Sequence, residues 1–229
     1  MNDRYTVQAR ALVQSEVLPD RSYRTDDGVL FVDFGKDAFG TLILMAPPSG
    51  FKRDSVVVHL GEKLTNADRI DRQPPGYVRY IRLEQKIDPQ CNSCRIRIPP
   101  DKRNTGPAAI KMPESVGQVF PFRYAEIEDA ADMDPAAVRQ IFVHYPFDDE
   151  ASFFASSNTV LNAVWDLCKY SIKATSFCGV YIDGDRERIP YEADAYINQL
   201  GHYAVDREYA MARYTHEYLL QHPTWPTEW

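Results

Sequence analysis

Long apolar runs and cysteine are scarce in this 229-residue chain, and basic residues are outnumbered by acidic ones. No stretch reaches the roughly 18 apolar residues of a membrane-spanning helix, so we expect no membrane partner. The chain starts without the apolar core of a signal peptide. Because the natural protein can begin upstream, its localisation stays open. The formal net charge of -7 argues against nucleic acid as a partner, since a nucleic-acid surface needs clustered Lys and Arg.

The four cysteines are too few and too irregularly spaced to cross-link a chain of this length. Cys91 and Cys94 form a C-x-x-C pair. A zinc site normally needs two further ligands at matching spacing, and the sequence offers none nearby. We therefore expect no metal site, and interpret the pair as small residues in a turn between strands.

Residues 1–147 carry short apolar runs, several of which alternate with polar residues as a half-buried strand must. The spacers between them, such as Ala46–Gly50 and Gln73–Gly76, are rich in Pro and Gly. Many short strands separated by such turns predict an antiparallel β-sandwich. The expected strands include Val29–Val32, Thr41–Leu44, Ser55–Val58, Val78–Leu83, Val119–Tyr124 and Val138–Val143.

Residues 148–229 change to a helical pattern. Ser156–Asn158 is a cluster of good N-cap residues, and apolar residues follow at helical spacing from Val160 to Ile172. This predicts a helix that ends near Thr175, and two more are expected over about 192–204 and 207–221. Three helices with such bulky apolar faces cannot cover one another. We therefore expect a truncated helical domain with apolar surface left in water.

The segment Asp183–Asp194, between the first two expected helices, packs five carboxylates and two guanidiniums into twelve residues. Acids that share a pocket raise one another's pKa, while an Arg holds a neighbour ionised. Such a pair of states suits glycoside hydrolysis. From charge pattern alone, however, a solvated and self-paired surface loop is the more common structure. Calcium binding is a weak alternative, because the spacing does not fit the twelve-residue calcium loop.

Five segments together resemble the inverting, six-hairpin α-L-rhamnosidases. In that family a loop near the start of the helical toroid reads approximately Asp-Gly/Cys, Arg-Asp/Glu-Arg, an aromatic residue, a small pair and Asp, which Asp183–Asp194 matches. Phe154–Trp165 is similar to the family's first toroid helix. The family's β-sandwich domain is similar to this chain at Asp33–Gly40, His59–Glu62 and Phe122–Ile127. All five segments occur in the family's order, and this agreement favours a rhamnosidase-like loop over a solvated surface loop.

The resemblance implies an antiparallel β-sandwich over 1–147, followed over 148–229 by the first helices of an incomplete (α/α)6 six-hairpin toroid. It implies an enzyme that hydrolyses terminal α-L-rhamnosyl residues by a single displacement, with inversion at the anomeric carbon. Glu187 would be its general acid. The implied substrate-binding residues are Asp183, Arg186, Arg188, Tyr191 and Asp194. Asp183 and Asp194 would bind rhamnose hydroxyls, one of the two arginines would line the pocket, and Tyr191 would replace a stacking Trp.

The family's general base is a Glu far downstream, to which no residue of this chain corresponds, so we expect the isolated chain to be inactive. The resemblance implies a carbohydrate substrate and no cofactor, and leaves the oligomeric state open. We expect Asp194 to be ionised with a lowered pKa near a helix start; the alternative is a helix-capping Asp. A non-catalytic carbohydrate-binding or structural sandwich, and a six-hairpin hydrolase of another sugar, also remain open.

Overall fold

The computed structural model describes residues 12–66, 69–131 and 133–221, and the chain divides into two compact units. The sheet unit comprises Gln14–Pro99 and Pro113–Val143. The helical unit comprises Met1–Val13, Pro100–Met112 and His144–Trp229. The grouping of Pro100–Met112 with the helices was not predicted. A domain boundary between residues 147 and 148 stays a prediction.

The sheet unit is built on antiparallel pairing. Eight strands share one sheet in the order β1-β10-β3-β9-β4-β7, with β2 and β8 also paired to β3, and β5 and β6 form a separate ladder. Each register that the structure describes is antiparallel. The strands are β1 (Val13–Val17), β2 (Arg21–Arg24), β3 (Leu30–Met45), β4 (Ser55–Gly61), β5 (Leu64–Asn66), β6 (Arg69–Ile70), β7 (Tyr80–Lys86), β8 (Ser93–Arg95), β9 (Phe120–Ile127) and β10 (Val138–His144), with a 3-10 turn at Pro135–Ala137.

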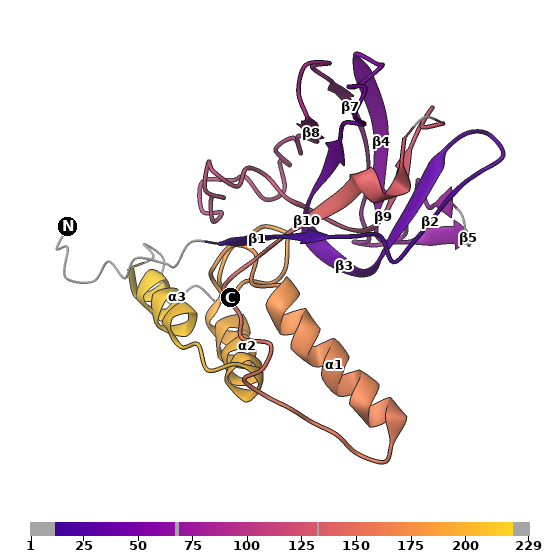
Figure 1. Ribbon diagram of the computed structural model, residues 1–229. Helices are drawn as coiled ribbons and strands as arrows, with labels where there is room; N and C mark the ends of the chain where they lie inside the picture. The colour runs from indigo at the N-terminus through magenta and orange to yellow at the C-terminus, as the bar shows by residue number, and fades with distance from the viewer. Residues whose placement is uncertain (1–11, 67–68, 132, 222–229) are drawn as a thin grey trace. The chain divides into compact units, whose positions relative to one another are not determined.

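The long strand β3 merges two strands that the sequence predicts separately (Figure 1). Its register with β9 shifts between Asp33 and Ala38. Gly35 has a φ of 78°, which a glycine adopts without strain, and its N–H donates to Asp33 Oδ1 at 2.8 Å. Asp33 also pairs with Arg123 at 2.7 Å. The Asp33–Gly40 segment therefore contains an irregularity in the middle of β3. The start of β3 pairs with β2, and its end pairs with β10 and β8.

The core of the sheet unit confirms the expected strands. Leu60 and Phe122 have no exposed surface, and both belong to one cluster to which β3, β4, β9 and β10 contribute. At Gly40 an added Cβ would lie 1.9 Å from the carbonyl oxygen of Ile141, so only glycine permits this approach of β3 to β10. Antiparallel β-structure followed by helices is the fold class predicted from the sequence.

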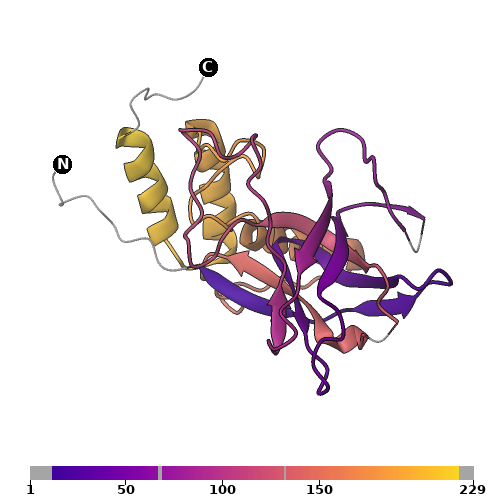
Figure 2. The ribbon, with the colours of Figure 1, turned by 90° about the horizontal axis from the view of Figure 1, so that it is seen from above.

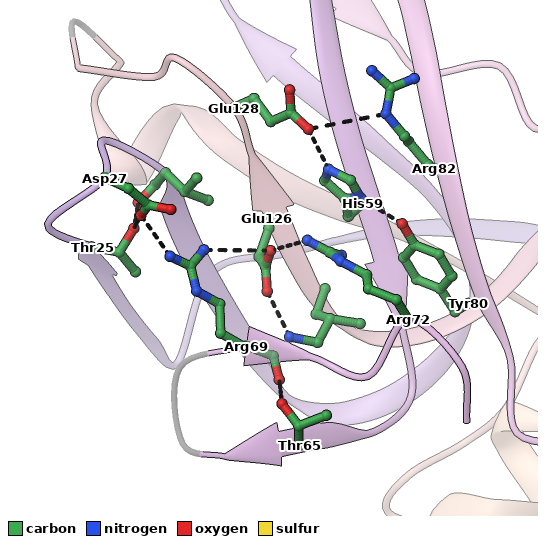
Figure 3. A network of polar contacts seen from close by, with 12 residues as sticks. Thr25, Asp27, His59, Thr65, Arg69, Arg72, Tyr80, Arg82, Glu126 and Glu128 are labelled. Atoms are coloured by element: carbon green, nitrogen blue, oxygen red, sulfur yellow. Dashed lines mark hydrogen bonds and ion pairs between the residues drawn. The ribbon is translucent and has the colours of Figure 1, made fainter. Parts of the chain in front are cut away.

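Two groups of polar contacts join strands of the sheet unit, one between β4 and β7 and one between β9 and β6 (Figure 3). His59 Nδ1 lies 2.7 Å from the Tyr80 hydroxyl, and its Nε2 lies 2.6 Å from Glu128 Oε1. The fully buried carboxylate of Glu126 pairs with Arg72 and accepts from Ile70 N at 2.6 Å. A buried charge needs such partners. The segments His59–Glu62 and Phe122–Ile127 thus supply part of the internal bonding of the sheet.

The helical unit contains the three expected helices in its described residues: α1 (Thr159–Ala174), α2 (Glu192–Val205) and α3 (Ala210–Gln221). Asn158 caps α1, since its side chain accepts from the N–H groups of Val160 and Leu161. The third helix begins later than the predicted residue 207. Glu208 explains this, because its carboxylate accepts from Ala210 N and Met211 N and so caps the helix there.

Helix α2 contacts both α1 and α3, and Figure 2 shows α2 beside α3. An added Cβ at Gly201 would meet Ile172 Cδ1 at 2.9 Å, so the glycine lets α1 and α2 approach closely. Large apolar side chains nevertheless stay exposed, as expected: Val160 by 68%, Leu167 by 64% and Ile197 by 66%. In the described residues, no helix combines the length and apolar character needed to cross a bilayer.

Candidate functional site

The acidic segment forms an irregular loop between α1 and α2. Gly184 has a φ of 62°, directly after Asp183, and Arg188 has a φ of 56°. The left-handed region is open to glycine, but it is uncommon for a residue with a side chain. Backbone in sparsely populated regions gathers at functional sites, where surrounding contacts hold it. The loop then enters α2, whose N-cap position is Tyr191.

Arg186 gathers two of the predicted site residues. Its Nη2 lies 2.7 Å from Asp183 Oδ2. It also makes two bonds to Glu187, from Nε to Oε2 at 2.5 Å and from Nη2 to Oε1 at 2.9 Å. Such two-point pairing of guanidinium and carboxylate is directional as well as strong. The Arg186 side chain is half exposed, so a ligand has access to it.

The electrostatics of the loop differ between its acids. The hydrogen bond from Arg186 is the largest influence on Glu187 and lowers its pKa, with a smaller contribution in the same direction from a Tyr191 hydrogen bond. Burial raises the pKa of Tyr191, and Glu187 adds to that rise. In the unliganded protein Glu187 is therefore held as a carboxylate.

Asp194 differs from its expectation. Burial, and then the negative charges of Asp183 and Glu187, raise its pKa instead of lowering it. Burial is the largest cause of this rise in pKa, and the two neighbouring acids add to it. Asp194 lies in the first turn of α2 and Tyr191 occupies the N-cap position, so the alternative of Asp194 as the N-cap residue is wrong. The structure places Asp194 within electrostatic reach of Asp183, Arg186 and Glu187.

Arg188 differs from Arg186 because it is buried. Its residue is only 2% exposed, its guanidinium pairs with the buried Asp185, and it lies 5.5 Å from the centre of the Phe177 ring. The sequence treats Arg186 and Arg188 as interchangeable candidates for a pocket arginine. Their exposure distinguishes them, because Arg186 is open to a ligand and Arg188 is enclosed by protein.

A distant segment that the sequence reasoning missed also supports the loop. Asn104 Nδ2 lies 2.9 Å from Asp185 Oδ1, and Ile110 N donates to the carbonyl oxygen of Arg188 at 2.8 Å. Asn104 is 2% exposed. Nothing in the local sequence pattern around Asn104 marks this role, since the contacts join residues 81 positions apart.

Within the described residues, no group of three or more His, Cys, Asp or Glu side chains is arranged to hold a metal ion. The C-x-x-C pair of the sheet unit has one exposed member, Cys91, and one buried member, Cys94. Cys94 lies on β8 and Cys91 in the preceding turn. The loop itself presents carboxylates, guanidiniums and the phenol of Tyr191.

Sequence comparison matches the part of the chain that contains this loop to a known family. Residues 149–225, which include the whole of Asp183–Asp194, match the family model of the bacterial alpha-L-rhamnosidase 6 hairpin glycosidase domain. This part of the chain therefore resembles the six-hairpin rhamnosidases. None of the curated proteins matches the sequence.

Solved rhamnosidases share the fold over most of this chain. The Streptomyces avermitilis α-L-rhamnosidase, solved with L-rhamnose, is 15% identical with a TM-score of 0.61, and the match covers 91% of this chain and 18% of that one. The α-L-rhamnosidase from Dictyoglumus thermophilum is 14% identical with a TM-score of 0.63, and the match covers 90% of this chain and 21% of that one. The rhamnosidase from Klebsiella oxytoca, with rhamnose bound, is 13% identical with a TM-score of 0.55, and the match covers 91% of this chain and 44% of that one. The chain thus spans less than half of each of these rhamnosidases, and it resembles glycoside hydrolases of the α-L-rhamnosidase type.

Proposed function

We propose that this chain supplies the general-acid side of an active site that hydrolyses terminal α-L-rhamnosides with inversion. Glu187 donates the proton to the glycosidic oxygen. Asp183, Arg186, Tyr191 and Asp194 bind the rhamnosyl ring. The observation that carries the proposal is the half-exposed Arg186, which joins Asp183 to Glu187 on a loop inside the family match.

A general acid must hold its proton at the moment of bond cleavage, whereas Arg186 lowers the pKa of Glu187. Bound sugar resolves this conflict in the proposed mechanism. Rhamnose hydroxyls accept hydrogen bonds from Arg186 and draw it from Glu187, while the ring displaces water from the carboxyl group. Both changes raise the pKa of Glu187. Glu187 therefore becomes protonated, and able to act as an acid, only when substrate is bound.

Arg188 is omitted from the proposed sugar contacts because it is buried against Asp185 and Phe177. The general base is also unassigned, since no residue here matches the family's base. Inverting glycosidases place their two carboxyl groups roughly 6.5–9.5 Å apart, which leaves room for the attacking water. The proposal requires the natural protein that carries this sequence to provide a second carboxylate at that separation.

The test is a hydrolysis screen of that natural protein against aryl glycosides of several sugars, followed by NMR of the first-formed anomer. We expect turnover of the α-L-rhamnoside with release of β-L-rhamnose. Preference for another sugar would refute the assigned substrate and leave the hydrolase chemistry standing. Release of α-L-rhamnose would refute inversion. Absence of hydrolysis with every sugar, in a folded protein that binds carbohydrate, would favour a non-catalytic binding module.

A further inference from the structure

We infer that Asn104 is a positioning residue for Glu187, acting through Asp185 and Arg188. The inference rests on the proposed function, in which Glu187 is the acid. Asn104 lies outside residues 149–225, which match the rhamnosidase family model. It belongs to the segment Pro100–Met112, which lies between β8 and β9 in sequence but groups with the helical unit.

The contacts form a short chain of buried polar groups. The Asn104 amide donates to Asp185 Oδ1 at 2.9 Å. The same carboxylate oxygen accepts from Arg188 Nε. The side chains of Asp185 and Arg188 are 5% and 1% exposed. Glu187 lies between these two partners in sequence, so the backbone that carries it is fastened on both sides.

Buried ion pairs need additional hydrogen bonds, because attraction alone does not reliably offset the loss of water. Asn104 supplies one to Asp185 as a neutral donor, so it adds no charge to the pair. A second bond from the same segment, Ile110 N to the Arg188 carbonyl oxygen at 2.8 Å, holds the backbone next to Glu187. Arg188 has a left-handed φ of 56°. Such a conformation persists only when surrounding contacts over-determine it, and the segment provides those contacts.

Loss of the Asn104 bond would leave Asp185 short of a donor and let the Asp185–Arg188 stretch shift. Acid catalysis depends on the distance between the proton donor and the leaving oxygen, and misplacement by about 1 Å can cost on the order of 10²-fold. The residues that bind the sugar from the exposed side of Arg186 would be less affected. The effect should therefore fall on proton donation more than on substrate binding.

The experiment compares Asn104→Ala with Thr105→Val in the natural full-length protein. Thr105 is the matched control, because it is exposed and its hydroxyl donates only within the segment, to Asp101 O at 2.7 Å. Each variant is assayed on a rhamnoside with a poor leaving group and on one with an activated leaving group. For Asn104→Ala we expect kcat to fall about 10–100-fold on the poor substrate and less than about threefold on the activated one, with KM little changed. Thr105→Val should match the parent on both.

A second pair of variants guards against simple misfolding. Asn104→Asp sets two carboxylates against each other and should be worse than Asn104→Ala. Combining it with Asp185→Asn restores one carboxylate and one amide, and should recover part of the lost kcat. Failure of the combined variant to exceed Asn104→Asp would overturn the inference, and so would equal slowing of the two substrates by Asn104→Ala.

Hydrogen exchange separates this inference from the proposed function. In Asn104→Ala, amides of residues 183–191 should exchange faster than in the parent and in Thr105→Val. This readout needs no turnover. Faster exchange in a protein inactive on rhamnosides would keep the support role and reject the substrate, whereas unchanged exchange in that loop would reject the support role.

Discussion

The sheet unit closes its own core, whereas the helical unit leaves apolar faces open. Leu60 and Phe122 have no exposed surface. On α1 and α2, by contrast, Leu161 is 51% exposed and Leu200 is 52% exposed. A sheet that bends at β3 gathers many strands around one core. Three helices in a row cannot do this, because each needs neighbours on more than one side. The difference teaches that an apolar stripe predicts a helix without predicting what covers it.

The largest expected effect tests the closed core. Phe122→Ala should lower the free energy of unfolding by about 3–5 kcal/mol, because it removes a buried ring and leaves a cavity. Phe153→Ala is the matched control, since Phe153 is 88% exposed in the helical unit, and it should cost less than about 0.5 kcal/mol. Urea unfolding followed by circular dichroism measures both. Equal losses would show that the two units are equally closed.

The second prediction uses an acid pair of the sheet unit. Burial, with the neighbouring Glu62, raises the pKa of Asp37 to about 8 from an ordinary value of 3.8. Between these values the folded state keeps a proton that the unfolded state has released, so stability falls as pH rises, by at most about 1.4 kcal/mol per pH unit. Asp37→Asn should flatten this slope.

Unfolding of the parent and of Asp37→Asn at about pH 5 and about pH 8 provides the measurement. Between these two pH values the parent should lose more free energy of unfolding than the variant loses. A slope that is the same in both proteins would remove Asp37 as its source.

The third prediction concerns the open, charged loop of the helical unit. Asp194→Asn keeps the shape of the side chain but weakens charge-assisted hydrogen bonds to rhamnose hydroxyls. Rhamnose affinity of the natural protein should fall about tenfold, equivalent to about 1.4 kcal/mol, and turnover should fall alike for good and poor leaving groups. Calorimetric titration with rhamnose measures the affinity. Unchanged affinity, with only a lower melting temperature, would remove Asp194 from the sugar site.

The smallest effect on stability is expected at the exposed stripe of α1. Leu161→Gln replaces a half-exposed Leu by another good helix former, so the free energy of unfolding should change by less than about 0.5 kcal/mol. Its effect should appear in association, because exposed apolar patches promote contacts between molecules. Sedimentation at increasing concentration should show less self-association than in the parent. Greater destabilisation would mean that Leu161 is already covered.

The local patterns predict most of the fold. Asn158, with apolar spacing after it, fixes where α1 begins. The merger of two predicted strands into β3 could not be foreseen, because the turn-like Asp33–Gly40 segment forms an irregularity whose shape depends on Arg123 from another strand. Short strands such as β2 and β8 were also missed, since they depend on pairing with β3 and carry little pattern of their own.

The candidate site divides in the same way. The order of residues identifies Asp183–Asp194 as a rhamnosidase-like loop, which the family match covers. Burial then distinguishes Arg188 from Arg186, and burial together with neighbouring acids raises the pKa of Asp194. Those properties depend on three-dimensional neighbours. Asn104 in particular reaches the loop from 81 residues away.

The most direct test of the account is Glu187→Gln in the natural full-length protein, assayed on two rhamnosides that differ only in leaving-group acidity. Gln keeps the shape of Glu but has no proton to donate. General acid catalysis is worth about 10²–10⁴-fold, so we predict a loss of that order on the poor leaving group and a much smaller loss on the activated one. Equal loss on both substrates would contradict the assignment of Glu187 as the acid.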